Sequence, residues 1–273
     1  IGFPFLLTYV VETLIISSDR YLLAFIIDIK SVSYYVPAYI LGSLPILIAR
    51  VLGVVLPQIL SICVDKNFNE LGRNLIKQSK LYFLALSIPF FLGSIVIGKE
   101  VLSIYTNPEI ANQGHIVFSI ISFSSIFFGL FIIHSNIVFV RLKTKELFRV
   151  NLWMFLINFI FNFILLYLFQ NINYAALVTL LSYIFGYVLL NKLILKDNLF
   201  FKIASLDIIK ILLTSVVAIL LLATLQLIQS EYNIFFNILL TTGIYFLLLL
   251  ICFYKRLLSS FKKSDEIKFL FKT

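Results

Sequence analysis

Four charged residues interrupt the first two apolar stretches of the chain, where charge has a chemical consequence. They are Glu12, Asp19 and Arg20 in the first stretch and Arg50 in the second. On membrane-insertion scales, a charge at a helix centre costs about 2.5–3.5 kcal/mol unless it is paired or faces water. An arginine in a low-dielectric site is well suited to bind phosphate. These residues therefore predict a polar site inside a membrane protein.

The spacing of these residues places several of them on one side of the first helix. Thr8, Glu12 and Asp19 are four and seven residues apart and share a face that suits a hydrated cavity. For Asp19 and Arg20 a second interpretation stays open, in which both are solvated at the outer membrane interface. Glu12 and Arg50 are expected at similar depths in antiparallel helices. We expect them to interact directly or through water.

The composition requires a lipid environment for most of the chain. Of 273 residues, 61% are hydrophobic and 13% are charged, and the mean hydropathy is +1.05. Soluble domains are about 45–50% apolar and about 25% charged. Eight stretches reach the roughly 20 apolar residues of a membrane-spanning helix: 3–27, 32–60, 80–98, 115–140, 150–169, 174–195, 207–228 and 235–254. The predicted fold class is an all-α polytopic membrane protein with about eight transmembrane helices.

Basic residues occur in alternate connectors, which predicts the orientation in the membrane. Most lysines and arginines lie after the second, fourth, sixth and eighth stretches. By the positive-inside rule, these segments and both ends of the chain are cytoplasmic. The net charge of +9 therefore reflects topology. No interleaving of aromatic and basic residues indicates a nucleic-acid partner.

Local signals predict irregular helices. Pro37, Pro45 and Pro57 interrupt the second stretch, and interior prolines bend or break helices. Asn67 is expected to cap a short amphipathic helix that lies on the cytoplasmic membrane surface. Residues 101–105 suggest a shorter counterpart on the outer side.

No residue pattern indicates catalysis. The sequence has no catalytic triad, no phosphate-binding glycine loop and no HExxH motif. Its two cysteines, Cys63 and Cys252, suit neither a disulfide framework nor a metal site. Asn158 and Asn162 lie four residues apart and are expected to hydrogen-bond to a neighbouring helix. We therefore expect a protein that is not an enzyme and has no cofactor.

Several short motifs resemble bacterial polysaccharide flippases. The run Ser17-Ser18-Asp19-Arg20-Tyr21-Leu22-Leu23 resembles the seventh transmembrane helix of that family. A Tyr-rich family pattern resembles Ser33-Tyr34-Tyr35-Val36-Pro37-Ala38-Tyr39, although Ser33 stands where many relatives have glycine. Two further segments follow in family order: Leu56-Pro57-Gln58-Ile59 and Asn69-Glu70-Leu71. These flippases belong to the multidrug/oligosaccharidyl-lipid/polysaccharide exporter superfamily, which has a MATE-like fold.

The resemblance implies two six-helix bundles around a central cavity, and this chain matches the second. Residues 1–195 are expected to form that bundle, residues 196–254 two additional helices, and residues 255–273 a basic cytoplasmic tail. The first bundle would be missing, so we expect the C-terminal part of a longer protein. The implied function is transport of an undecaprenyl-pyrophosphate-linked oligosaccharide across the bacterial inner membrane, as in O-antigen and lipopolysaccharide synthesis.

The candidate substrate-binding residues are Arg20, Arg50, Glu12 and Asp19. Arg50 is expected to matter most for the pyrophosphate, and Arg20 less if a neighbouring acid holds it. The partners are then the lipid-linked oligosaccharide and the bilayer, and a coupling cation is left open. The alternative is a cation-coupled multidrug exporter of the same superfamily, in which the carboxylates of Glu12 and Asp19 would act.

Overall fold

The computed structural model describes residues 2–200, 205–228 and 240–251. They form α1 (Gly2–Ile26), α2 (Ile29–Gly42), α3 (Leu44–Asp65), α4 (Asn69–Tyr105), α5 (Pro108–Val140), α6 (Thr144–Phe169), α7 (Ile172–Ile194) and α8 (Ser205–Ile228). A further apolar helix spans Leu240–Ile251. These described ranges contain no strand, which confirms the all-α prediction.

Six helices are long and apolar enough to cross a membrane by length and composition: α3, α4, α5, α6, α7 and the Leu206–Thr224 part of α8. The chain is therefore a multi-pass membrane protein. α1 has 25 residues but carries three charges, and α2 has only 14 residues. The count of eight crossings stays a prediction, since residues 235–254 fall partly outside the described ranges. The basic tail, 255–273, lies wholly outside them.

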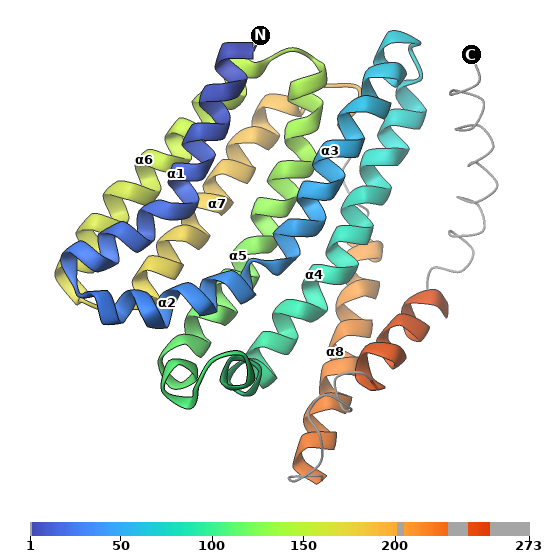
Figure 1. Cartoon of the computed structure of the whole chain (residues 1–273). Coiled ribbons are helices and arrows are strands. Elements are labelled where there is room, and N and C mark those ends of the chain that lie inside the picture. Colours follow the sequence, from blue (N-terminus) through green and yellow to red (C-terminus); the bar gives the residue numbers. More distant parts are fainter. Residues whose placement is uncertain (1, 201–204, 229–239, 252–273) are drawn as a thin grey trace. The chain divides into compact units, whose positions relative to one another are not determined.

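The chain divides into two compact units, residues 1–204 and 205–273. In the first unit, α5 packs against α2, α3, α4, α6 and α7, while α1 packs mainly against α6 and α2. Figure 1 shows α1, α6 and α7 on one side of α5, α3 and α4 on the other, and α2 crossing one end. Short connectors make successive long helices antiparallel. The second unit contains α8 and the helix Leu240–Ile251.

The second predicted stretch consists of two helices that meet at Ser43. α2 ends at Gly42 and α3 begins at Leu44, with Pro45 in its first turn. Proline is tolerated at a helix start because its missing N–H has no partner there anyway. The predicted bend is thus confirmed as a break before Pro45. Pro37 lies inside a helix that continues past it.

α2 is held against α5 by two close backbone approaches that require glycine. A Cβ on Gly42 would lie 2.9 Å from the Phe118 carbonyl oxygen, and one on Gly114 would lie 2.8 Å from the Tyr34 carbonyl oxygen. Neither backbone atom can move without shifting a helix. α2 therefore forms a fixed platform for the tyrosines that it carries.

α4 corrects one prediction from the sequence. Residues 69–105 form one continuous helix of 37 residues, about 55 Å long at 1.5 Å per residue. The predictions of a separate surface helix and of a shorter outer counterpart are therefore wrong. Both segments are the ends of α4, and no proline separates them from its apolar centre. Asn67 does not cap the helix: it has φ 59°, a left-handed conformation that asparagine tolerates, and Phe68 directly precedes α4.

Basic connectors meet at one end of the first unit. Arg141, after α5, forms two hydrogen bonds with the carboxylate of Asp197, at 2.9 and 3.3 Å. Arg73, near the start of α4, donates to the backbone carbonyl of Asn198 at 3.1 Å. The connectors that follow α3, α5 and α7 therefore lie together, as their alternation in the sequence predicts.

Candidate functional site

Glu12 and Arg50 form a salt bridge between α1 and α3. Arg50 Nη2 donates to Glu12 Oε1 at 2.9 Å, which confirms the predicted pairing. α1 packs mainly on α6 and α3 mainly on α5 and α4, so the pair bridges two helices whose main packing partners differ. The Glu12 side chain is 20% exposed and the Arg50 side chain is 40% exposed. Water or a ligand can therefore reach the pair.

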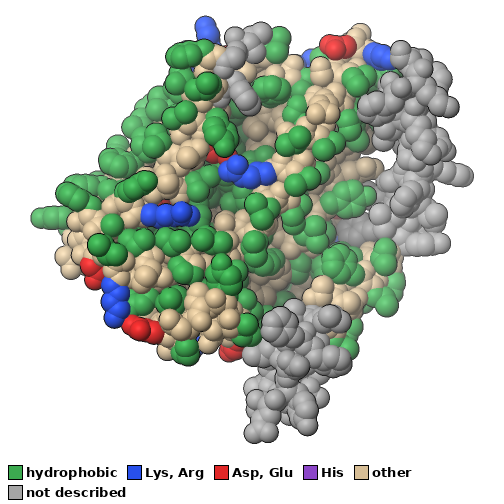
Figure 2. Space-filling view, in the orientation of Figure 1, with side chains coloured by type: hydrophobic (Ala, Val, Ile, Leu, Met, Phe, Trp, Pro, Cys, Tyr) green, Lys and Arg blue, Asp and Glu red, His purple; other side chains and the backbone are tan. Residues whose placement is uncertain are grey.

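The surface around this pair is apolar. Exposed side chains include Tyr9, Val10 and Leu14 on α1 and Leu47, Val51 and Val54 on α3. Figure 2 shows isolated basic side chains among hydrophobic ones on the face that contains α1 and α3. An isolated cation on such a surface gives a point of attraction for an anion in otherwise nonpolar surroundings.

Arg20 has a different environment from Arg50. Its guanidinium carbon lies 5.4 Å from the centre of the Tyr39 ring, in a cation–π contact. Its Nε is buried and has no hydrogen-bond partner among the described residues. Arg20 also forms no salt bridge among the described residues. The three salt bridges found there involve other residues. Arg20 thus interacts electrostatically with the adjacent Asp19 but, unlike Arg50, forms no direct salt bridge with a carboxylate among the described residues.

Asp19 is fully buried and is surrounded by protein donors. Asn162 Nδ2 donates to its Oδ1 at 2.7 Å, and the hydroxyls of Tyr35 and Thr179 donate to its Oδ2 at 2.8 and 2.7 Å. The cluster joins α1, α2, α6 and α7. Its residues are not merely solvated at an interface, so that interpretation does not hold for Asp19. A substrate-binding role for Asp19 stays a prediction.

Asn158 extends this cluster towards the core. It accepts from the Ser18 hydroxyl at 2.9 Å and from Asn162 at 3.2 Å, and its amide donates to Ser182 at 3.4 Å. The predicted hydrogen bonding of both asparagines to neighbouring helices is confirmed. Thr179 and Ser182 lie singly in an apolar stretch, so their spacing in the sequence indicates no role for them. The only signal for them was the asparagine pair that they face.

The donor set of the cluster limits what it could hold. The described residues contain no group of three or more His, Cys, Asp and Glu side chains that could hold a metal ion. The oxygens near Asp19 come from one carboxylate, two amides and hydroxyls, and Asn162 Oδ1 is buried without a partner among the described residues. A set of neutral oxygens together with one carboxylate is of the kind that binds a hard cation.

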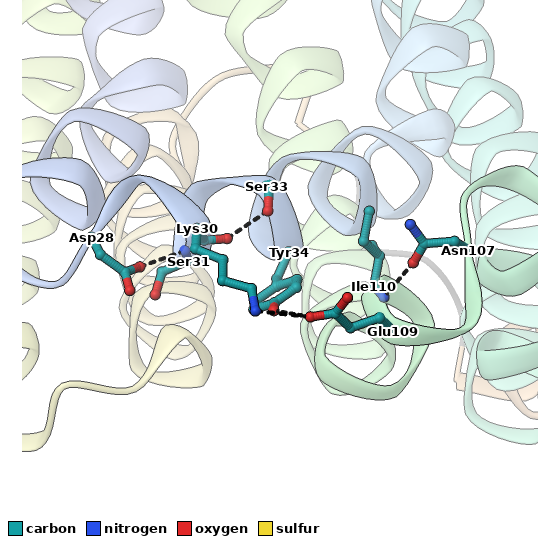
Figure 3. Close-up of polar contacts among 8 residues, drawn as sticks. All are labelled: Asp28, Lys30, Ser31, Ser33, Tyr34, Asn107, Glu109 and Ile110. Atoms are coloured by element: carbon teal, nitrogen blue, oxygen red, sulfur yellow. Dashed lines mark hydrogen bonds and ion pairs between the residues drawn. The ribbon is translucent and has the colours of Figure 1, made fainter.

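A second polar cluster fastens α2 to α5 at the opposite end from the basic connectors (Figure 3). Lys30 Nζ lies 3.0 Å from Glu109 Oε1, and the Tyr34 hydroxyl donates to the same oxygen at 2.6 Å. Hydrogen bonding to Tyr34 and Glu109 raises the pKa of Lys30. Asp28 caps α2 by accepting from the backbone N–H of Ser31 at 2.6 Å, and its bonds with Ser31 lower the pKa of Asp28.

Comparison with known proteins identifies the fold. No protein-family model and no curated protein matches the sequence. Among solved structures, the chain is similar to lipid II flippase MurJ in an inward closed conformation, with a TM-score of 0.72 and 17% sequence identity. The two proteins share a fold. The match covers 92% of this chain but 53% of that one, so the chain spans about half the length of the flippase.

Proposed function

We propose that the protein translocates a lipid-linked oligosaccharide with an anionic pyrophosphate across the bacterial inner membrane. One observation carries the proposal: Arg20 lies over the Tyr39 ring and forms no salt bridge among the described residues, whereas Arg50 is paired directly with Glu12. A guanidinium binds phosphate oxygens through a planar pair of donors. The shared fold with a lipid II flippase supports the transport of a lipid-linked substrate.

The structure changes which arginine we expect to dominate. From the sequence, Arg50 is expected to matter most for the pyrophosphate, and Arg20 less if a neighbouring acid holds it. However, Asp19 binds three protein donors, whereas Glu12 binds Arg50 directly. We therefore assign the first contact with pyrophosphate to Arg20. Arg50 becomes available only when its bond to Glu12 opens.

The multidrug-exporter alternative is not favoured. An exporter of cationic drugs needs carboxylates that are free to attract the drug or a coupling cation. Glu12 is occupied by Arg50, and both oxygens of Asp19 accept hydrogen bonds from protein donors. Asp19 could take up a coupling cation only after these donors turn away from its oxygens.

The remaining parts of the proposal concern architecture and orientation. We propose that residues 1–195 act as the second six-helix bundle of a two-bundle transporter, with two added helices in 196–254. Both ends of the chain are proposed to be cytoplasmic, because the basic connectors lie at one end of the first unit.

The test is complementation of surface polysaccharide in a flippase-deficient strain, with the full-length gene product that contains this chain. Arg20→Ala should reduce polysaccharide at least tenfold, because a charge-assisted hydrogen bond contributes about 1.5–3 kcal/mol. Arg20→Lys should restore it only in part, since lysine lacks the planar fork. Arg149→Ala, at an exposed position in α6, is the matched control and should have no effect. Wild-type polysaccharide with Arg20→Ala at normal protein levels would overturn the proposal.

A further inference from the structure

Tyr39 lies between the interior of the first unit and Arg20. The residue is 3% exposed, and its ring lies beneath the Arg20 guanidinium. Its hydroxyl is 3.3 Å from the hydroxyl of Tyr183 on α7. Tyr183 is fully buried and stacks on Phe128 of α5, with ring centres 4.3 Å apart. The orientation of the Tyr39 ring is thus set by helices packed behind it.

Apart from the Tyr39 ring, the Arg20 guanidinium has few contacts that could fix its orientation. Arg20 Nε has no hydrogen-bond partner and Arg20 has no salt bridge among the described residues. The neighbouring Asp19 accepts hydrogen bonds from other side chains. The aromatic ring is therefore the contact that orients the cation, and a ring face attracts a guanidinium without using its N–H donors.

We propose that Tyr39 is a positioning residue that holds the Arg20 guanidinium so that its outer N–H groups face a pyrophosphate-class anion. This inference rests on the proposed function. The ring itself is required, because a ring face attracts a cation through its quadrupole. The Tyr39 hydroxyl is secondary, since it acts only by fixing the ring against Tyr183. Tyr39→Phe should therefore be mild and Tyr39→Leu severe.

A first experiment needs no substrate. The full-length protein in nanodiscs is treated with phenylglyoxal, and modification of each arginine is followed by mass spectrometry. Tyr39→Leu should raise the modification rate of Arg20 several-fold and leave Arg50 unchanged as the internal reference, whereas Tyr39→Phe should match wild type. Tyr39→Met serves as a second variant if Tyr39→Leu does not fold. An unchanged Arg20 rate in the ring-less variant would overturn the inference.

A second experiment measures binding of a polyprenyl pyrophosphate, with the same polyprenol lacking phosphate as the control ligand. Loss of a cation–π contact should weaken binding of the pyrophosphate roughly 2- to 30-fold in Tyr39→Leu. In an Arg20→Ala background, Tyr39→Leu should cause no further loss. Additive losses would show that Tyr39 acts independently of Arg20, and so overturn its positioning role. A wild-type protein that does not prefer the pyrophosphate would instead refute the proposed function.

Discussion

Two adjacent tyrosines provide a matched test of how burial changes the value of one hydrogen bond. Tyr35 is fully buried and its hydroxyl donates to Asp19 at 2.8 Å. Tyr34 donates to Glu109 at 2.6 Å, but the Glu109 side chain is 62% exposed. Replacement of either tyrosine by phenylalanine removes one hydroxyl that donates to a carboxylate. The two sites differ in burial, and Glu109 also keeps its salt bridge with Lys30.

The expected effects differ because water can replace the lost donor at only one of the two sites. In Tyr35→Phe, the buried Asp19 Oδ2 keeps only its bond from Thr179. Loss of a hydrogen bond to a charged group costs about 1.5–3 kcal/mol. For a unit of this length, each kcal/mol lowers the Tm by about 2–4 °C, so Tyr35→Phe should lower it by roughly 3–12 °C. Tyr34→Phe should cause a clearly smaller change, since water solvates Glu109.

The assay uses a thiol-reactive fluorogenic dye during thermal unfolding in nanodiscs. Cys63 is fully buried in α3 and reacts only when the first unit opens. Replacement of Cys252 by alanine leaves Cys63 as the one thiol in the sequence. Equal Tm shifts for the two tyrosine variants would refute the argument from burial. No shift for Tyr35→Phe would refute the assigned hydrogen bond to Asp19.

Three further predictions concern packing, pH and orientation. Gly129→Ala should destabilise the protein by about 1–3 kcal/mol in the same assay, because a Cβ there would overlap the buried Phe83 ring. The Asp28 cap has a pKa below the ordinary 3.8, so its stabilisation is complete above that value and is lost as the pH falls through the lowered pKa. The protection factor for hydrogen exchange at the start of α2, which compares the observed rate with the intrinsic rate at the same pH, should therefore fall in acid, and Asp28→Ala should remove this dependence. Cysteines placed at Lys143 should resist an impermeant thiol reagent added outside intact cells, whereas one at Asn171 should react.

Each of these three predictions has a measured outcome that would contradict it. A Gly129→Ala protein with wild-type stability would mean that the Phe83 ring adapts without cost. A fall of the protection factor in acid that persists in Asp28→Ala would assign the effect to another group. Outside labelling at Lys143 would reverse the proposed orientation.

The sequence predicted the features that depend on hydropathy and helix depth. The Glu12–Arg50 pair could be expected because both residues interrupt neighbouring antiparallel helices at similar distances from their ends. The break before Pro45 followed from local stereochemistry. The prediction for α4 fails at its ends because hydropathy detects only the apolar centre, whereas the helix continues through the polar residues at both ends and past Pro89.

The partners of Asp19 could not be derived in the same way. Tyr35 and Thr179 are uncharged and lie 16 and 160 residues away from it in the sequence. Their contact depends on how α2 and α7 rotate about their own axes, which is decided by tertiary packing. For the same reason, the sequence ranked Arg50 above Arg20. It could not reveal that the Arg20 guanidinium lies over the Tyr39 ring without a direct salt bridge among the described residues.

The Asp19 cluster also has a consequence for synthesis of the chain. Arg50 follows Glu12 by 38 residues, whereas Asn162 and Thr179 follow Asp19 by 143 and 160 residues. At 5–20 residues per second, Arg50 is made roughly 2–8 s after Glu12, but Asn162 is made roughly 7–29 s after Asp19. During that interval α1 contains a carboxylate whose donors on α6 and α7 do not yet exist. Until then Tyr35, 16 residues after Asp19, is the nearest of its three donors in the sequence, and the set is complete only after α7 has been translated.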